Sequence, residues 1–209
     1  MRKYLVSTAS LAVLLGAMGT ASAKEGDFSV YFSVGQGALY DTYAGGFFNA
    51  GPFNMELMAA KEIVQGIEIN GGFMFGIDTQ ETPIRDQNTT TQCTTVDAAT
   101  CGKARAKYIG FRPGIRLFLG DDRGQTQGGY LRLYLRAAFP IDISTQGDTT
   151  AASGAPVAGR TYVNVGILVG GGVEYRWKHV GIFGEVIVMP FFREFYMPVE
   201  GRVGIAAHF

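Results

Sequence analysis

The sequence predicts an all-β chain that folds as a transmembrane up-and-down antiparallel β-barrel of eight strands. Three observations support this prediction. Apolar residues alternate with small or polar residues in eight segments, and a tilted membrane strand needs about ten such residues. The composition is rich in Gly, Phe and Tyr, with 30, 15 and 10 residues of each. After residue 23, no stretch has the periodicity of a helix, and none is long enough for a spanning helix.

The segment at 129–141 has the clearest alternation, because Leu131, Leu133 and Leu135 alternate with Arg132, Tyr134 and Arg136. Connectors after the first, third, fifth and seventh segments are long, whereas those after the second and sixth are tight turns. This asymmetry is typical of outer-membrane barrels, although the fourth connector is longer than the pattern predicts. The predicted segments are 27–40, 53–64, 66–78, 106–120, 129–141, 161–177, 180–192 and 199–209.

The charges decide which face meets lipid. A soluble ligand-carrying barrel would have a polar outer face dense in Lys and Glu, but here that parity is mostly Gly, Ala, Ser and Tyr. The apolar parity carries almost no charge apart from Lys61, and a charge facing mid-bilayer lipid costs about 2–4 kcal/mol. We therefore expect the polar parity, with six acids and six arginines, to line the lumen. The predicted lumen charge network is Glu56, Glu68, Arg112, Arg116, Arg132, Arg136, Glu174, Glu185, Glu200 and Arg202.

These lumen charges fit two structures. They can form a charged constriction in a small pore, or a salt-bridged plug in a bore just wide enough for side chains. Equal numbers of each sign favour the plug, because each buried ion then has a partner. Assuming an up-and-down strand order, we predict two ion pairs between adjacent strands, Glu68–Arg116 and Glu185–Arg202.

The first 23 residues resemble a secretory signal peptide. Arg2 and Lys3 precede a short apolar run that ends in the small residues of Ala21–Ala23. The predicted domains are therefore a signal peptide at 1–23 and a barrel at 24–209. In an oxidising compartment, we expect Cys93 and Cys101 to form a disulfide. Lys and Arg together number 18, as do Asp and Glu, and this balance argues against nucleic acid as a partner.

The last strand alternates up to Phe209, and a strand in a closed barrel pairs on both edges. With the signal peptide and eight strands, this ending resembles the small outer-membrane barrels of the OmpA/OmpX-like group. The resemblance implies a bacterial outer-membrane protein that contacts lipid and is delivered by periplasmic chaperones to the barrel-assembly machinery. It also implies an assembly signal in the last strand, although Ala207 lies where an aromatic residue is common. The signal residues are Val203, Ile205, Ala207 and Phe209.

No catalytic, cofactor or metal site is predicted. The chain has two histidines, His179 and His208, and neither has a serine or aspartate at a spacing that suggests a catalytic triad. We expect a non-enzymatic structural protein that displays external loops. The alternatives are a pore for ions or small solutes, an outer-leaflet lipid-modifying enzyme, and a soluble ligand-carrying barrel.

Overall fold

A computed structural model describes residues 28–41, 47–79, 82–85, 101–119, 129–151, 154, 156–192 and 196–209. No helix in these ranges is long and apolar enough to span a bilayer. The strands are β1 (Phe28–Asp41), β2 (Phe47–Val64), β3 (Ile67–Ile77), β4 (Thr82–Arg85), β5 (Cys101–Ala104), β6 (Ala106–Leu119), β7 (Tyr130–Ala138), β8 (Ile141–Gln146), β9 (Thr149–Thr150), β10 (Pro156–Val157), β11 (Arg160–Val165), β12 (Leu168–Trp177), β13 (Val180–Val188) and β14 (Tyr196–His208).

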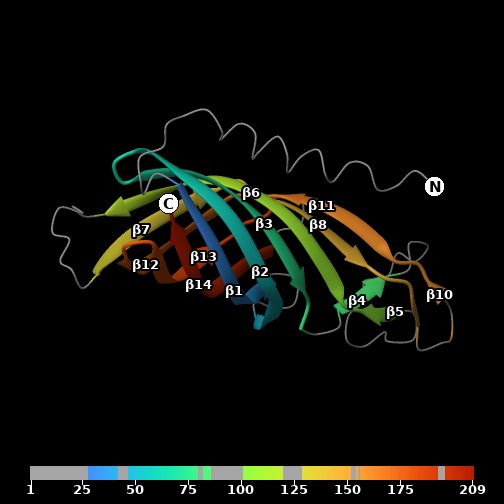
Figure 1. Cartoon of the computed structure of the whole chain (residues 1–209). Helices are drawn as coiled ribbons and strands as arrows, with labels where there is room; N and C mark the ends of the chain where they lie inside the picture. The colour runs from blue at the N-terminus through green and yellow to red at the C-terminus, as the bar shows by residue number, and fades with distance from the viewer. Residues whose placement is uncertain are drawn as a thin grey trace.

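The main sheet is a closed antiparallel ring (Figure 1). Its strands follow the order β11-β8-β6-β3-β2-β1-β14-β13-β12-β7, and pairing between β6 and β7 closes the ring. β7 and β8 both pair with β6 in one register, and β12 and β11 continue beside them. β7 and β8 together therefore make one barrel strand, and β11 and β12 together make another. The predicted eight-stranded up-and-down barrel is confirmed.

The fifth barrel strand extends further than predicted, whereas the sixth begins within one residue of its predicted start. β8 continues to Gln146 and β11 begins at Arg160. A break around Pro140 separates β7 from β8, because proline has no amide hydrogen for the ladder. Across the break, the Gly166 amide donates to the carbonyl oxygen of Pro140 at 3.1 Å. The predicted segment therefore ended at a local interruption rather than at the true end of the strand.

The two ends of the barrel differ. Tight turns at Gln65–Gly66 and Lys178–His179 connect strands at one end, and Gly66 has a φ of 80° that favours glycine. At the other end, the hairpins β4–β5 and β9–β10 extend beyond the ring (Figure 1). We call these the turn end and the hairpin end. The β9–β10 hairpin lies within the predicted long connector after the fifth segment.

The last strand is paired along both edges. β14 pairs with β1 on one side and with β13 on the other. At its end, the Phe209 amide donates to the carbonyl oxygen of Phe28 at 2.8 Å, and the His208 amide donates to that of His179 at 2.8 Å. The alternating run up to Phe209 is therefore part of the ladder that closes the ring.

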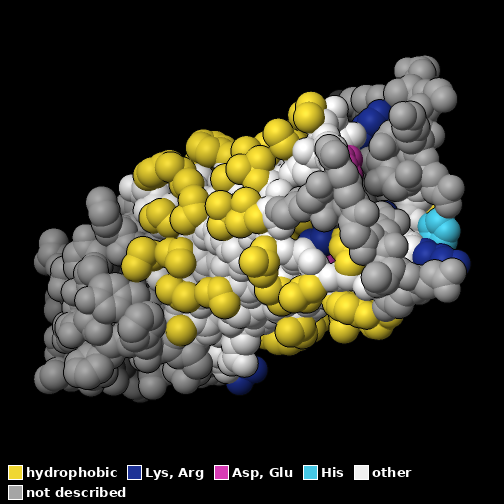
Figure 2. All heavy atoms as spheres, turned by 90° about the vertical axis from the view of Figure 1, so that its left-hand side faces the viewer, with side chains coloured by type: hydrophobic (Ala, Val, Ile, Leu, Met, Phe, Trp, Pro, Cys, Tyr) yellow, Lys and Arg dark blue, Asp and Glu magenta, His cyan; other side chains and the backbone are white. Residues whose placement is uncertain are grey.

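The outer wall is apolar. Leu131, Leu133 and Leu135 of β7 all have half or more of their surface exposed, and Figure 2 shows hydrophobic side chains distributed across the visible wall. Among the described residues of the barrel strands, the outward parity carries charge at Lys61 and Lys107. Each lies near a rim, since Lys61 pairs with Phe28 and Lys107 pairs with Ile77. This distribution suits a wall surrounded by hydrocarbon.

Candidate functional site

The inward-facing positions of the strands place buried charged side chains along the bore. Each of the ten residues of the predicted lumen network lies inside the barrel with at most 4% of its surface exposed. Asp142 and His208, which are not among these ten residues, are buried in the same bore. Asp142 was missed because it follows the break at Pro140, although its alternation with Ile141 and Ile143 continues the strand.

Glu56 lies at the centre of this network. Its carboxylate from β2 is contacted by Arg136 of β7 and Arg202 of β14. Arg112 of β6 lies on a third side, with its Nη1 atom 3.7 Å from Glu56 Oε2. Gly72 of β3 leaves the space for this carboxylate, because a Cβ atom at Gly72 would collide with it. One acid thus links four barrel strands.

The other central acids share the same guanidinium groups. Arg136 Nη1 lies 2.9 Å from Glu185 Oε1, and Arg202 Nη2 lies 2.6 Å from Glu200 Oε2. Arg112 Nη2 lies 3.2 Å from Asp142 Oδ2. The Arg136–Glu185 contact reaches past β12, whereas Arg112 and Asp142 lie on the paired strands β6 and β8, and Arg202 and Glu200 both lie on β14. Buried ions require such compensation, because an unpaired charge costs several kcal/mol.

The two predicted ion pairs have different environments. Glu185 and Arg202 are register partners, and Arg202 Nη1 lies 3.9 Å from Glu185 Oε1. Glu68 and Arg116 are also register partners, but the hydroxyl of Tyr31 donates to the carboxylate of Glu68 at 3.0 Å. Arg116 Nη2 lies 3.7 Å from Glu185 Oε2.

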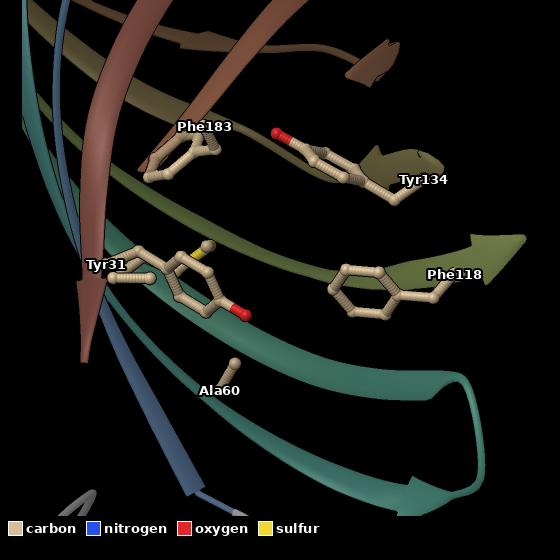
Figure 3. Packing of buried hydrophobic residues seen from close by; sticks show 7 residues of the cluster. Tyr31, Ala60, Phe118, Tyr134 and Phe183 are labelled. Atoms are coloured by element: carbon tan, nitrogen blue, oxygen red, sulfur yellow. The ribbon is translucent and has the colours of Figure 1, made fainter. Parts of the chain in front are cut away.

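Aromatic rings surround Arg116 on the turn-end side of the network. Its guanidinium carbon lies 4.2 Å from the ring centre of Tyr31 and 4.4 Å from that of Tyr134, so cation–π attraction holds the charge. Phe118 and Phe183 lie in the same cluster (Figure 3). The rings come from four barrel strands and fill the bore at this level.

A Ser–His–Glu cluster lies next to these rings, near the turn end. His208 Nδ1 is 2.8 Å from the Oγ atom of Ser29, and His208 Nε2 is 2.7 Å from the Oε1 atom of Glu174. The spacing of these residues in the sequence did not indicate that Ser29 and His208 would meet. These residues are far apart in sequence and come together because β1 pairs with β14, while Glu174 reaches across β13. Gly181 of β13 leaves room for that reach, since its Cβ would lie 2.6 Å from Glu174 Oε1.

The surroundings of this cluster do not suit nucleophilic catalysis. Ser29, His208 and Glu174 each have 1% or less of their surface exposed, and the ring of Tyr31 packs edge-on against His208 with centroids 5.8 Å apart. A nucleophile needs space for a reacting carbonyl beside its oxygen. The cluster instead links the strands on both sides of β13.

An apolar cluster fills the bore on the hairpin-end side of the network. Leu168, Ile187, Met189 and Phe191 are buried together with Ala138. The bore thus contains, from one end to the other, the Ser–His–Glu cluster, the aromatic rings, the ionic network and this apolar cluster. In this respect the lumen resembles a packed core more than a water-filled channel.

The remaining predicted residues that the structure describes lie outside the bore. Val203, Ile205 and Phe209 of the predicted assembly signal point outward and are exposed, and Ala207 is half-buried on the same face. Cys101 begins β5, but Cys93 lies outside the described residues, as does the predicted signal peptide at 1–23. The disulfide and the signal peptide stay predictions. The described residues contain no group of His, Cys, Asp and Glu that suits a metal ion.

Glu56→Gln tests the central ionic contacts. The substitution leaves Arg112, Arg136 and Arg202 with too little negative charge, so we expect the free energy of unfolding to fall by about 3–5 kcal/mol. Urea titration of the barrel in lipid vesicles measures this change. Glu62→Gln is the matched control at the rim and keeps the oxygen that accepts the Gly66 amide. Equal effects of the two substitutions would show that Glu56 is not central.

Gly181→Ala tests the contact that crosses β13. The new methyl group would press on Glu174 and His208, and we expect a loss of about 1–3 kcal/mol in unfolding free energy. Gly184→Ala is the control in the same strand, because its Cβ would have no neighbour closer than 3.8 Å. The same urea titration applies, and an unchanged midpoint for Gly181→Ala would contradict the tight packing of this cluster.

Similarity to known proteins lies in structure alone. No protein-family model and no curated protein matches the sequence. Neisserial surface protein A matches with a TM-score of 0.57 and 11% identity, over 90% of this chain and all of that chain. The attachment invasion locus protein Ail of Yersinia pestis matches with a TM-score of 0.55 and 11% identity, over 89% of this chain and all of that chain. A major outer membrane protein of Thermus thermophilus matches with a TM-score of 0.50 and 13% identity, over 86% of this chain and 99% of that chain. The chain therefore has the fold of small outer-membrane β-barrels.

Proposed function

We propose that this chain is a non-enzymatic integral protein of a bacterial outer membrane, with a structural role and loops displayed at the hairpin end. The apolar wall supports membrane insertion, since Leu133, Leu135 and Ile205 face outward with half or more of their surface exposed. The fold shared with outer-membrane proteins supports that membrane in particular. Longer connections normally lie outside the cell, so the hairpin end would face outward and the turn end would face the periplasm.

The filled bore is the observation that carries the structural role. Arg112, Arg116, Arg136 and Arg202 are nearly fully buried and in contact with acids or rings. Apolar or aromatic clusters lie on both sides of the ionic network. An ion crossing this bore would have to separate several of these contacts. The arrangement therefore favours a plug over a pore.

An enzyme receives less support. Hydrolysis of an outer-leaflet lipid would need a nucleophile accessible from that leaflet, whereas Ser29 is buried near the turn end. Biogenesis would follow the exported route, with periplasmic chaperones and the barrel-assembly machinery as transient partners and membrane lipid as the lasting one. The exposed aliphatic residues and Phe209 of the last strand are the features that this machinery would read.

Single-channel recording in planar bilayers tests the plug. We expect no steady conductance steps from the purified barrel, because ionic, aromatic and apolar side chains of the described residues are buried in successive layers of the bore. Heat-modifiable migration of the same sample on gels verifies that the inserted protein is folded. Reproducible steps that scale with protein concentration would contradict the plug and favour the pore for ions or small solutes.

A further inference from the structure

A small cavity lies inside the bore, between the ionic network and the apolar cluster at the hairpin end. Its volume is about 20 Å³, and its polar lining includes Asn54, Arg112, Asp142 and Glu200. Met189 and Phe191 line its apolar side. The cavity therefore lies where charged and apolar parts of the bore meet.

Several polar atoms around this cavity have no partner within the described residues. Asn54 has 1% of its surface exposed, and neither its Oδ1 nor its Nδ2 atom has a hydrogen-bond partner there. Asp142 Oδ1 and Arg112 Nε are in the same situation, whereas Asp142 Oδ2 accepts from Arg112. A buried polar group without a hydrogen bond costs about 1–3 kcal/mol. Donors and acceptors thus line a space in the interior.

The mixture of groups determines which guest fits. Arg112 disfavours a cation in the cavity, and the carboxylates of Asp142 and Glu200 disfavour an anion. Asn54 offers both a donor and an acceptor, so a neutral molecule with both capacities is favoured. A water molecule needs a cavity of roughly 10–15 Å³ and two to four polar partners.

We propose that this cavity is a binding site for one structural water molecule. The water accepts a hydrogen bond from Asn54 Nδ2 or Arg112 and donates to Asp142 Oδ1 and Asn54 Oδ1. It joins β2, β6 and β8 at a level where Asn54 makes no direct contact with the ionic network. The water completes the hydrogen bonding of the plug on its hairpin-end side.

Asn54→Leu gives opposite results for a hydrated and a dry cavity. Leucine has a similar volume and cannot hydrogen-bond. If the water is bound, its loss leaves Asp142 Oδ1 and Arg112 Nε without a hydrogen-bond partner, and we expect the folding equilibrium constant to fall about tenfold. If the cavity is dry, the substitution removes two buried unpartnered atoms, and the constant rises. Urea titration in lipid vesicles gives the sign, and an unchanged or higher constant overturns the proposal.

Asn70→Leu is the matched control. Asn70 of β3 also has both amide atoms without a partner among the described residues, but it does not line this cavity. We expect this variant to be as stable as the parent chain or more stable. A similar loss from both substitutions would assign the effect to asparagine itself and overturn the water site.

Water–protein magnetisation transfer by NMR tests the unaltered chain, even if Asn54→Leu does not fold. In detergent micelles, we expect cross-peaks between the Asn54 side-chain amide protons and a long-lived water. Their absence in a spectrum that resolves this amide group overturns the proposal.

Discussion

Glu56 lies at the centre of the bore, where Arg112, Arg136 and Arg202 reach it from three other barrel strands. The rest of the architecture depends on this shared carboxylate. A wall that faces hydrocarbon cannot carry these charges on its outer side, so they must be paired inside the bore. In a bore this narrow, each ion must find its partners among the other inward-facing side chains. Gly72 leaves room for that contact, and Gly35 is similarly close to the side chain of Arg202. The small residues of the inward parity thus make space for the long ionic ones.

The packing of the bore follows from the same constraint. Charges gather in the middle, and buried rings and aliphatic side chains fill the space on both sides. The rings also compensate charge, since Arg116 lies against Tyr31 and Tyr134. The Ser–His–Glu cluster then links the first and last strands beside the closing pair of β1 and β14. A wall that must be apolar outside is therefore tied together by polar contacts inside.

Alternation along single strands predicted the ring, the apolar wall and the inward position of the charges. It did not predict most of the contacts. Which residues meet across the bore depends on the stagger between strands, so the meeting of Ser29, His208 and Glu174 cannot be read from any one segment. The two ion pairs were predicted from the register of adjacent strands, and Glu68 and Arg116 do lie opposite each other in that register. Tyr31 also contacts both side chains, and Tyr134 contacts Arg116. Pro140 hid Asp142 by interrupting a strand that continues beyond it.

Spin-label accessibility along β7 tests most directly whether lipid surrounds the wall while paired ions fill the bore. Nitroxides are placed one at a time from Leu131 to Ala138 in barrels reconstituted into vesicles. Collisions with oxygen, which concentrates in lipid, should peak at the odd-numbered positions, and collisions with a water-soluble nickel complex should be low at every position. Strong nickel collisions at the even-numbered positions would show a water-filled bore, and strong nickel collisions at the odd-numbered positions would show that the wall faces water. Either result would contradict the account.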